Sequence, residues 1–301
     1  MAIQRPHFAV IGGDVAYDNG LIPCACAWDG WLQIWESEAR VDGKYLIPLV
    51  FSVGNHDLGA NDNNNGALDG MFRSCDPSLP SHAMPPFLSW FPAQTMTTGE
   101  DNNKTTRVRP VCARTTLRKH KLPTVVNLWM LDTAYAVSPA ANVDFVNINM
   151  NVPAGEIDMI NMAVYHVPLY TSVRSSFQSS KYLRDIWVPS IFDKYNFSVC
   201  FENHAHSYKR TLPLRNSTVV PPGDHQGGTV YVGDGKMGVA GQGIPTLEEI
   251  TTPAENNIFA HNGVQYHFFL VRLVAAVEGG WHMNLTMINN KGLVFDSTTI
   301  R

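Results

Sequence analysis

The stretch VCFENHAHSYKR, residues 199–210, ends an apolar run with two histidines that are one residue apart. If the run is a buried strand, side chains at i and i+2 point the same way, so His204 and His206 leave the strand end together. This spacing is typical of metal ligands, although two polar residues in a loop have the same form. The choice depends on whether other strands also end in ligand-type residues.

Apolar runs that end in polar residues or glycine recur along the chain. They cover residues 7–14, 45–57, 124–133, 159–166, 197–206 and 228–235. Short continuous runs of this kind are typical of strands buried on both faces, which predicts an α/β protein with covered sheets. Functional side chains are then expected at the strand ends, where the loops form a common rim.

The ends of these runs carry a mixed set of oxygen and nitrogen ligands. The set comprises Asp14 and Tyr17 after the first run, Asn55, His56 and Asp57 after the second, His166 after the fourth, and His204 and His206 after the fifth. Carboxylate, phenol, amide and imidazole groups together suit zinc, iron or manganese better than magnesium or calcium alone. Because the set exceeds one tetrahedral site, it favours two metals bridged by one carboxylate.

The same stretches resemble the ordered motifs of a known family. GDVAY, GNHD, YHVPLY, NHAHSYKR and GTVYVGDG look like those of the calcineurin-like metallophosphoesterases, in the purple acid phosphatase branch, from about Phe8 to Gly238. Tyr17 is the most branch-specific feature, since a tyrosine binds a ferric ion in that branch. The resemblance implies an α/β fold of the α+β type: a four-layer sandwich of two mixed β-sheets flanked by helices.

The resemblance also implies the roles of single residues. It assigns Asp14 as the bridge between two ions. The first ion, Fe(III), is expected to be held by Tyr17 and His206. The second, which is Zn, Fe(II) or Mn(II), is expected to be held by Asn55, His166 and His204. His56 is expected to bind the phosphate or the leaving group, with Asp57 orienting its ring and Asn55 close to the substrate. Arg174 is a further candidate for phosphate binding, although a surface arginine is an equal alternative.

The function implied is hydrolysis of phosphate monoesters, as in an acid phosphatase, by a hydroxide that two metals activate, with an acid pH optimum. A small phosphorylated molecule is the expected partner. Two alternatives stay open: a phosphodiesterase or nucleotide pyrophosphatase with the same centre, and a metal-binding protein with weak catalysis and a role in recognition.

The chain departs from the family pattern at several points. Only thirteen residues precede Asp14 and none is acidic, whereas the family has an earlier metal-binding aspartate. The chain is therefore expected to be a single catalytic domain, 1–301, without its first N-terminal strand and metal motif. Asn203 replaces a usual glycine and places an amide near the metals. Alternation at Val143, Phe145 and Asn147 predicts an extended segment where the family has a helix.

Other segments predict supporting elements. Trp28, Trp31, Leu32 and Trp35 recur at helical spacing, which predicts a helix over residues 29–40 with an aromatic core stripe. Three strands are expected after Tyr266, and much of 58–123 is expected to be loop. NDNNNGALDG loosely resembles a calcium loop, but its twelfth position is Phe72, which favours a solvated turn.

The amino-acid composition limits which binding partners and compartments are expected. The 301 residues carry a net charge of -4 and 45% hydrophobic residues, so there is no electrostatic footprint for nucleic acid and no nucleic-acid-binding motif. No apolar run predicts a membrane span, and the start lacks a signal-peptide pattern. Five cysteines form no CxxC pair; Cys75 and Cys112 are a candidate disulfide if the protein is exported. The compartment stays open, with secretion favoured by the family, and the oligomeric state is not predicted.

Overall fold

The structure is a computed structural model that describes residues 1–59, 85–91, 116–122, 125–150, 159–172, 178–221, 227–233, 256–276 and 280–300. Its helices are α1 (Cys26–Glu38), α2 (Asn55–Leu58), α3 (Pro86–Trp90), α4 (Pro139–Asn149) and α5 (Gln178–Trp187), followed by a short π-helical segment at Val188–Phe192. Short 3-10 helices lie at Ala2–Gln4, Ile22–Cys24 and Asn256–Ile258.

The centre of the molecule is a mixed sheet of seven strands in the order β13-β9-β12-β8-β7-β6-β5. Their bounds are β5 (Arg118–Leu122), β6 (Val126–Met130), β7 (Ile160–Tyr165), β8 (Phe197–Glu202), β9 (Tyr208–Thr211), β12 (Val230–Gly233) and β13 (Phe259–Gly263). Strands β6, β7, β8 and β12 run parallel to their neighbours in this group, and the outer strands run antiparallel. The strand ends that carry His166 and His204 therefore lie at one edge of the sheet.

Four smaller β units complete the fold. They are the parallel pair β1 (Ala9–Ile11) with β4 (Leu49–Phe51), the hairpins β2 (Arg40–Val41) with β3 (Tyr45–Leu46) and β10 (Leu214–Arg215) with β11 (Thr218–Val219), and the antiparallel sheet β14 (His267–Ala275), β15 (Trp281–Asn289) and β16 (Val294–Ile300). The six strands expected from apolar runs are present as β1, β4, β6, β7, β8 and β12, and the three expected after Tyr266 are β14 to β16.

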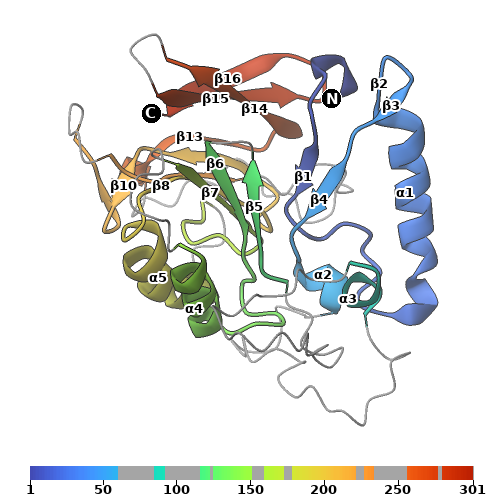
Figure 1. The fold of residues 1–301 in the computed structure, drawn as a ribbon, viewed down its shortest axis with the longest axis horizontal. Coiled ribbons are helices and arrows are strands. Elements are labelled where there is room, and N and C mark those ends of the chain that lie inside the picture. The colour runs from blue at the N-terminus through green and yellow to red at the C-terminus, as the bar shows by residue number, and fades with distance from the viewer. Residues whose placement is uncertain are drawn as a thin grey trace, which may run out of the picture.

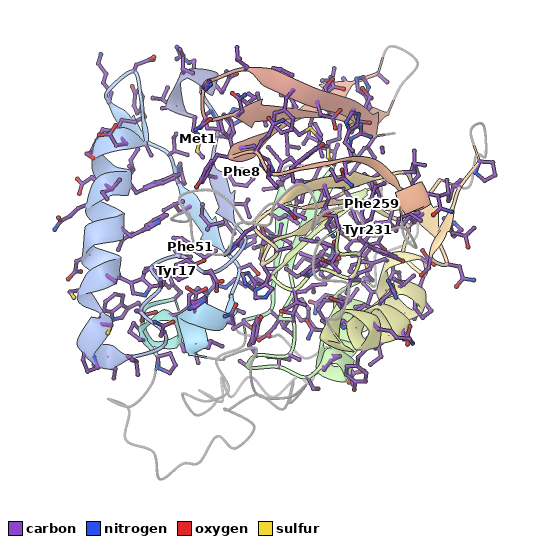
Figure 2. The ribbon with its side chains drawn as sticks, turned by 180° about the vertical axis from the view of Figure 1, so that it is seen from behind. Met1, Phe8, Tyr17, Phe51, Tyr231 and Phe259 are labelled. Carbon is purple, nitrogen blue, oxygen red and sulfur yellow. The ribbon has the colours of Figure 1, made fainter. Side chains whose placement is uncertain are left out.

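The two faces of the central sheet bury alternate residues of the same strands. Leu128 and Val164 point to one face, where they join a core with the sheet β14 to β16 and with Phe8 (Figures 1 and 2). Trp129 and Tyr165 point to the other face, which is covered by α4 and α5. This alternation is the period-two pattern of a strand buried on both sides.

The observed sheets differ in part from the expected pair of mixed sheets. The central sheet is mixed, but the sheet β14 to β16 is purely antiparallel, because consecutive strands joined by short connections pair as a meander. The parallel pair β1 and β4 forms a sheet of its own within the described residues. The mixed α/β architecture is confirmed, and the finer four-layer description stays a prediction.

The tryptophan-rich helix is α1, which spans Cys26–Glu38 rather than residues 29–40. Its tryptophans pack inward as predicted, whereas Leu32 of the predicted stripe is 37% exposed. Trp28 is fully buried and contacts Phe51 and Phe91 at ring-centroid distances of 6.0 and 5.2 Å. Trp31 and Trp35 stack on each other at 5.5 Å and are partly buried against β4. The helix therefore packs against the outer side of the parallel pair β1 and β4 (Figure 1).

The expectation of an extended segment around Val143 to Asn147 is wrong, since these residues form α4. Ser138 caps the helix: its Oγ accepts a hydrogen bond from the Ala141 amide at 3.2 Å, and Pro139 occupies the first turn. The buried positions 142, 145 and 146 follow helical spacing, a signal that the period-two reading overlooked. A helix therefore lies between β6 and β7 along the chain, where the sequence alternation predicted an extended segment.

Within the described residues, no helix combines the length and apolarity that a membrane span needs. Several predictions lie outside the described residues: the role of Arg174, the calcium-like loop at 61–72 and the pairing of Cys75 with Cys112.

Candidate metal centre

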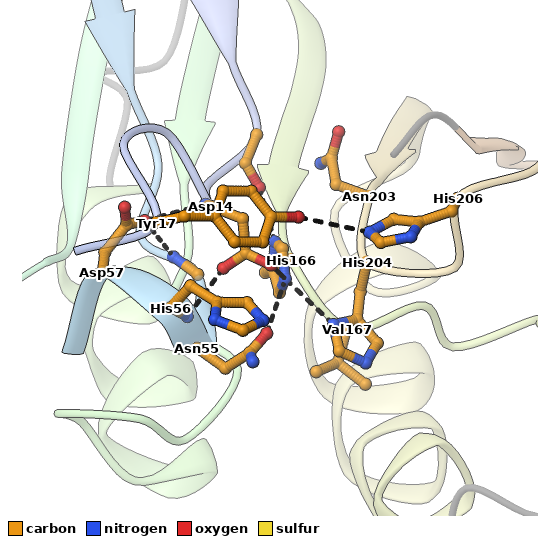
Figure 3. A network of polar contacts seen from close by, with 12 residues as sticks. Asp14, Tyr17, Asn55, His56, Asp57, His166, Val167, Asn203, His204 and His206 are labelled. Carbon is orange, nitrogen blue, oxygen red and sulfur yellow. Dashed lines mark hydrogen bonds and ion pairs between the residues drawn. The ribbon is translucent and has the colours of Figure 1, made fainter. Parts of the chain in front are cut away.

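The predicted ligands come from four strand ends that meet at one place (Figure 3). Asp14 follows β1, Asn55 begins α2 after β4, His166 follows β7, and His204 follows β8. β1 with β4 and β7 with β8 are parallel pairs from two different sheets, and the carboxyl ends of both pairs meet here.

Backbone strain is concentrated at this place. Of the eleven non-glycine residues with positive φ in the described part, five belong to these loops: Asp14 (55°), Tyr17 (53°), Asn19 (53°), His204 (30°) and His206 (52°). Such conformations persist only where the surrounding structure holds them, and they are typical of functional sites.

Two glycines let the β1 and β4 loops approach each other. Gly13 has a φ of +95°, and a Cβ there would lie 2.5 Å from the backbone nitrogen of Gly54. A Cβ on Gly54 would in turn lie 2.3 Å from Oδ1 of Asp14. A side chain at Gly13 would therefore push the two loops apart, and one at Gly54 would displace Asp14.

The buried half of the site is centred on His166. Its Nε2 lies 3.0 Å from Oδ2 of Asp14, 3.1 Å from Oδ1 of Asn55 and 3.0 Å from Nδ1 of His204. These side chains are nearly inaccessible: Asn55 is 3% exposed and His204 is 6% exposed. Asp14, His166 and His204 offer ligand atoms that all lie within 4.8 Å of one another.

The chemistry of these atoms fits a cation. Nδ1 of His166 lies 2.9 Å from the carbonyl oxygen of Gly12, which can only accept, so Nδ1 donates and Nε2 of the neutral ring carries a lone pair. That lone pair faces the acceptor oxygens of Asp14 and Asn55, and acceptors do not stabilise one another when buried. A metal ion or a proton between them is therefore needed, and a histidine fixed by a backbone carbonyl is the usual form of a metal ligand.

Asp14 and His166 stabilise each other's charged forms. Burial alone would raise the pKa of Asp14, but the charge of His166 and its hydrogen bond outweigh burial and lower this pKa to about 2. For His166, burial lowers the pKa, and the Asp14 charge more than reverses this effect. Oδ1 of Asp14 also accepts a hydrogen bond of 2.8 Å from the His56 amide. Asp14 thus stays ionised and fixed in direction.

The second half of the site consists of Tyr17 and His206. The Tyr17 hydroxyl lies 3.4 Å from Nε2 of His206, and the tyrosine is 36% exposed. Figure 3 shows this pair beside Asp14, so the structure brings together the two residues that the resemblance assigned to the first ion. Burial and the charges of Asp14 and Asp57 raise the pKa of Tyr17, so only a strong cation would remove its proton.

His56 is partly exposed beside Tyr17, and the contact that holds its ring comes from Asn19 rather than from Asp57. The His56 ring packs on Tyr17 at a centroid distance of 4.4 Å, and its Nδ1 lies 2.5 Å from Oδ1 of Asn19. Sequence reasoning missed Asn19, although it follows Tyr17 by only two residues. The carboxylate that orients a histidine in the prediction is replaced here by this amide.

Asp57 has a different position and holds the backbone. Its carboxylate accepts hydrogen bonds from the amides of Asp14 (2.8 Å), Val15 (3.0 Å) and Gly54 (2.8 Å). Burial and the nearby Asp14 charge raise the pKa of Asp57 to about 7. Asp57 therefore joins the β1 loop to the β4 loop.

Asn203 does not direct its amide at the metal ligands. Its Nδ2 donates to the carbonyl oxygen of Tyr165 at 2.7 Å, and its backbone amide donates to the His166 carbonyl at 2.9 Å. A Cβ on Gly12 would lie 1.9 Å from Cγ of Asn203, so this side chain fills the room beside Gly12. Asn203 joins the β1 loop to the β7 and β8 ends, which the sequence alone did not indicate.

Comparison with known proteins shows which fold the chain shares. By sequence, no protein-family model and no curated protein matches the chain. By structure, it is similar to the purple acid phosphatase PPD1 from seeds of yellow lupin (Lupinus luteus), with a TM-score of 0.59 and 16% identity over 97% of this chain. It covers 45% of that phosphatase, so it spans less than half of its length.

A second similar structure is GAP50, described as the anchor in the inner membrane complex of Plasmodium. The TM-score is 0.54 at 13% identity, over 100% of this chain and 80% of that one. At such identities the likeness concerns the fold, while the site rests on the residues described above. The chain therefore has the fold of the calcineurin-like metallophosphoesterases, with a buried Asp/His group placed where a metal could bind.

Proposed function

We propose that the protein is a metal-dependent hydrolase of phosphoric esters, and an acid phosphatase that acts on phosphate monoesters. The observation that carries the proposal is the convergence of Asp14, Asn55 and His204 on Nε2 of His166, with Tyr17 and His206 next to them. The fold is the one in which such a centre is expected.

The proposed ligands divide into two groups that share Asp14. Tyr17 and His206 would hold the first ion, Fe(III), and Asn55, His166 and His204 would hold the second, which would be Zn, Fe(II) or Mn(II). When bound, two such ions lower the pKa of water, polarise the phosphoryl oxygens and align the attacking and leaving oxygens.

The remaining residues prepare this centre for a substrate. The Gly12 carbonyl keeps the hydrogen of His166 on Nδ1, which reserves Nε2 for an ion. His56 donates from Nδ1 to Asn19, and in the protonated ring its Nε2 would donate to the phosphate or to the leaving oxygen. Asp57 keeps the loops of Asp14 and Asn55 together while substrate enters.

The test uses purified protein supplied with iron, zinc and manganese. Its metal content per chain is measured by elemental analysis, and p-nitrophenyl phosphate is assayed as a function of pH. We expect two ions, turnover with an acid optimum, and much slower hydrolysis of bis(p-nitrophenyl) phosphate. Protein that holds two ions but hydrolyses neither ester, nor ATP, would refute the proposal.

A second candidate function is that of a metal-binding recognition protein with weak catalysis. Among the described residues, the metal-binding group of His, Cys, Asp and Glu comprises Asp14, His166 and His204, and His206 lies outside it. This favours one ion rather than two. GAP50, which shares the fold, is described as an anchor. One ion per chain without ester hydrolysis would favour this candidate.

A further inference from the structure

A buried acidic residue stands directly behind the metal ligands. Glu202 is the last residue of β8 and precedes Asn203 and His204. It is 0% exposed, and no step of the proposed chemistry uses it. A carboxylate is not buried without donors around it, so its partners show what it does.

The Glu202 carboxylate connects three strand ends. Its Oε1 accepts hydrogen bonds from the Tyr165 hydroxyl at 2.8 Å and from the Leu169 amide at 2.7 Å. Its Oε2 forms an ion pair with Nζ of Lys209, which is 1% exposed. Tyr165 precedes His166, Leu169 follows it by three residues, and Lys209 follows His206 by three. The partners thus flank both histidine loops.

Packing also holds the aliphatic part of the Lys209 side chain. It crosses Gly233 of β12, where a Cβ would lie 2.5 Å from Cγ of Lys209. Because Gly233 has no side chain, the side chain of Lys209 has room to pass over β12 and reach Glu202. Charge, hydrogen bonds and packing all place this ion pair at one position.

We propose that Glu202 and Lys209 are positioning residues for the metal centre. By holding the Leu169 amide, Glu202 fixes the loop of His166 relative to the loop of His204, and so sets the distance between Nε2 of His166 and Nδ1 of His204. The inference rests on the proposed metal centre, and it does not require that the substrate be a phosphate monoester.

Two double variants separate positioning from mere stability. Glu202→Gln with Lys209→Met removes both charges but keeps an acceptor oxygen for Leu169. Glu202→Leu with Lys209→Met also removes that acceptor. Replacing both partners of a buried ion pair by uncharged groups is often tolerated, so both proteins are expected to fold, which circular dichroism and thermal unfolding will check.

The measurement is calorimetric titration of the metal-free proteins with Zn²⁺, together with hydrogen exchange of the segment that contains Leu169. We expect the Leu/Met variant to bind Zn²⁺ about 10- to 100-fold more weakly, the range typical of lost outer contacts of a metal site. We expect the Gln/Met variant to bind with nearly the original affinity. Exchange at Leu169 should rise only in the Leu/Met variant.

The matched control lies on the same strand. Arg210 is the neighbour of Lys209 and forms hydrogen bonds of 2.7 and 3.0 Å with Asp296 of β16. Asp296→Asn should lower thermal stability without changing Zn²⁺ affinity. The inference would be overturned if the two double variants bound Zn²⁺ with equal affinity. It would also be overturned if Asp296→Asn lost as much Zn²⁺ affinity as the Leu/Met variant.

The outcome also separates this inference from the proposed function. Affinities in the expected order with no ester hydrolysis would refute the phosphatase and support the positioning role. Hydrolysis with unchanged affinities would do the reverse. If the unsubstituted protein bound none of zinc, iron and manganese, both would be overturned.

Discussion

The two halves of the candidate site differ in how completely the protein forms them. In the half centred on His166, Nε2 has three ligand atoms at 3.0 to 3.1 Å and is almost closed to solvent. In the other half, Tyr17 and His206 are 3.4 Å apart and the tyrosine is 36% exposed. In the proposed two-ion centre, the buried half would be pre-organised for its ion, whereas the open half would depend more on its ion to draw the ligands together.

The largest effect is expected from the residue that both halves share. Asp14→Asn keeps the size of the side chain but removes the charge that attracts cations. We expect both ions to be lost and turnover to fall more than about 100-fold, beyond the usual cost of outer-shell changes. Asp29→Asn on the exposed side of α1 is the control. An Asp14 variant with full metal content would show that the two halves do not share this carboxylate.

The next comparison removes one histidine from each half. His204→Ala should release the ion of the buried half and cost about 100-fold or more in activity. His206→Ala should weaken the other ion and leave the buried half loaded. Elemental analysis of both variants checks this, with the exposed His7→Ala as a matched control outside the predicted ligand set. Nearly unchanged turnover in His204→Ala would mean that the site is elsewhere.

Tyr17→Phe tests the open half alone. Tyrosinate bound to Fe(III) absorbs visible light, so iron-loaded protein should be coloured and the variant should not. The zinc content of the buried half should be unchanged, because Tyr17 has no described contact with His166 or His204. Colour that persists in the phenylalanine variant would exclude Tyr17 as a ligand.

The smallest effect on chemistry is expected at Asn203. Asn203→Gly removes the hydrogen bond to the Tyr165 carbonyl and empties the space beside Gly12. We expect a loss of about 1–3 kcal/mol in the free energy of unfolding and only a modest change in activity. Thermal unfolding and steady-state kinetics measure the two effects. A fall in activity of several orders of magnitude would give the amide a catalytic role.

The same contrast explains what the sequence could predict. Strand ends and their ligands follow from local patterns, so Asp14 and His166 were identified from apolar runs and their final residues. The amides around Asp57, the position of Asn19 next to His56 and the contacts of Glu202 depend on how loops from different strands meet. No local pattern encodes such lateral contacts. Residues 139–149 form the helix α4, with an N-cap at Ser138, although Val143, Phe145 and Asn147 alternate as in a strand.

The long sequence separations within the site bear on when the protein can acquire its metals. Asn55 and His166 are 111 positions apart, and Tyr17 and His206 are 189 apart. Such distant contacts form late, because loop closure must precede them. During synthesis, the N-terminal ligands leave the ribosome well before His204. An ion that arrived then would find only part of its ligands, so a loaded centre would mark a chain whose folding is complete.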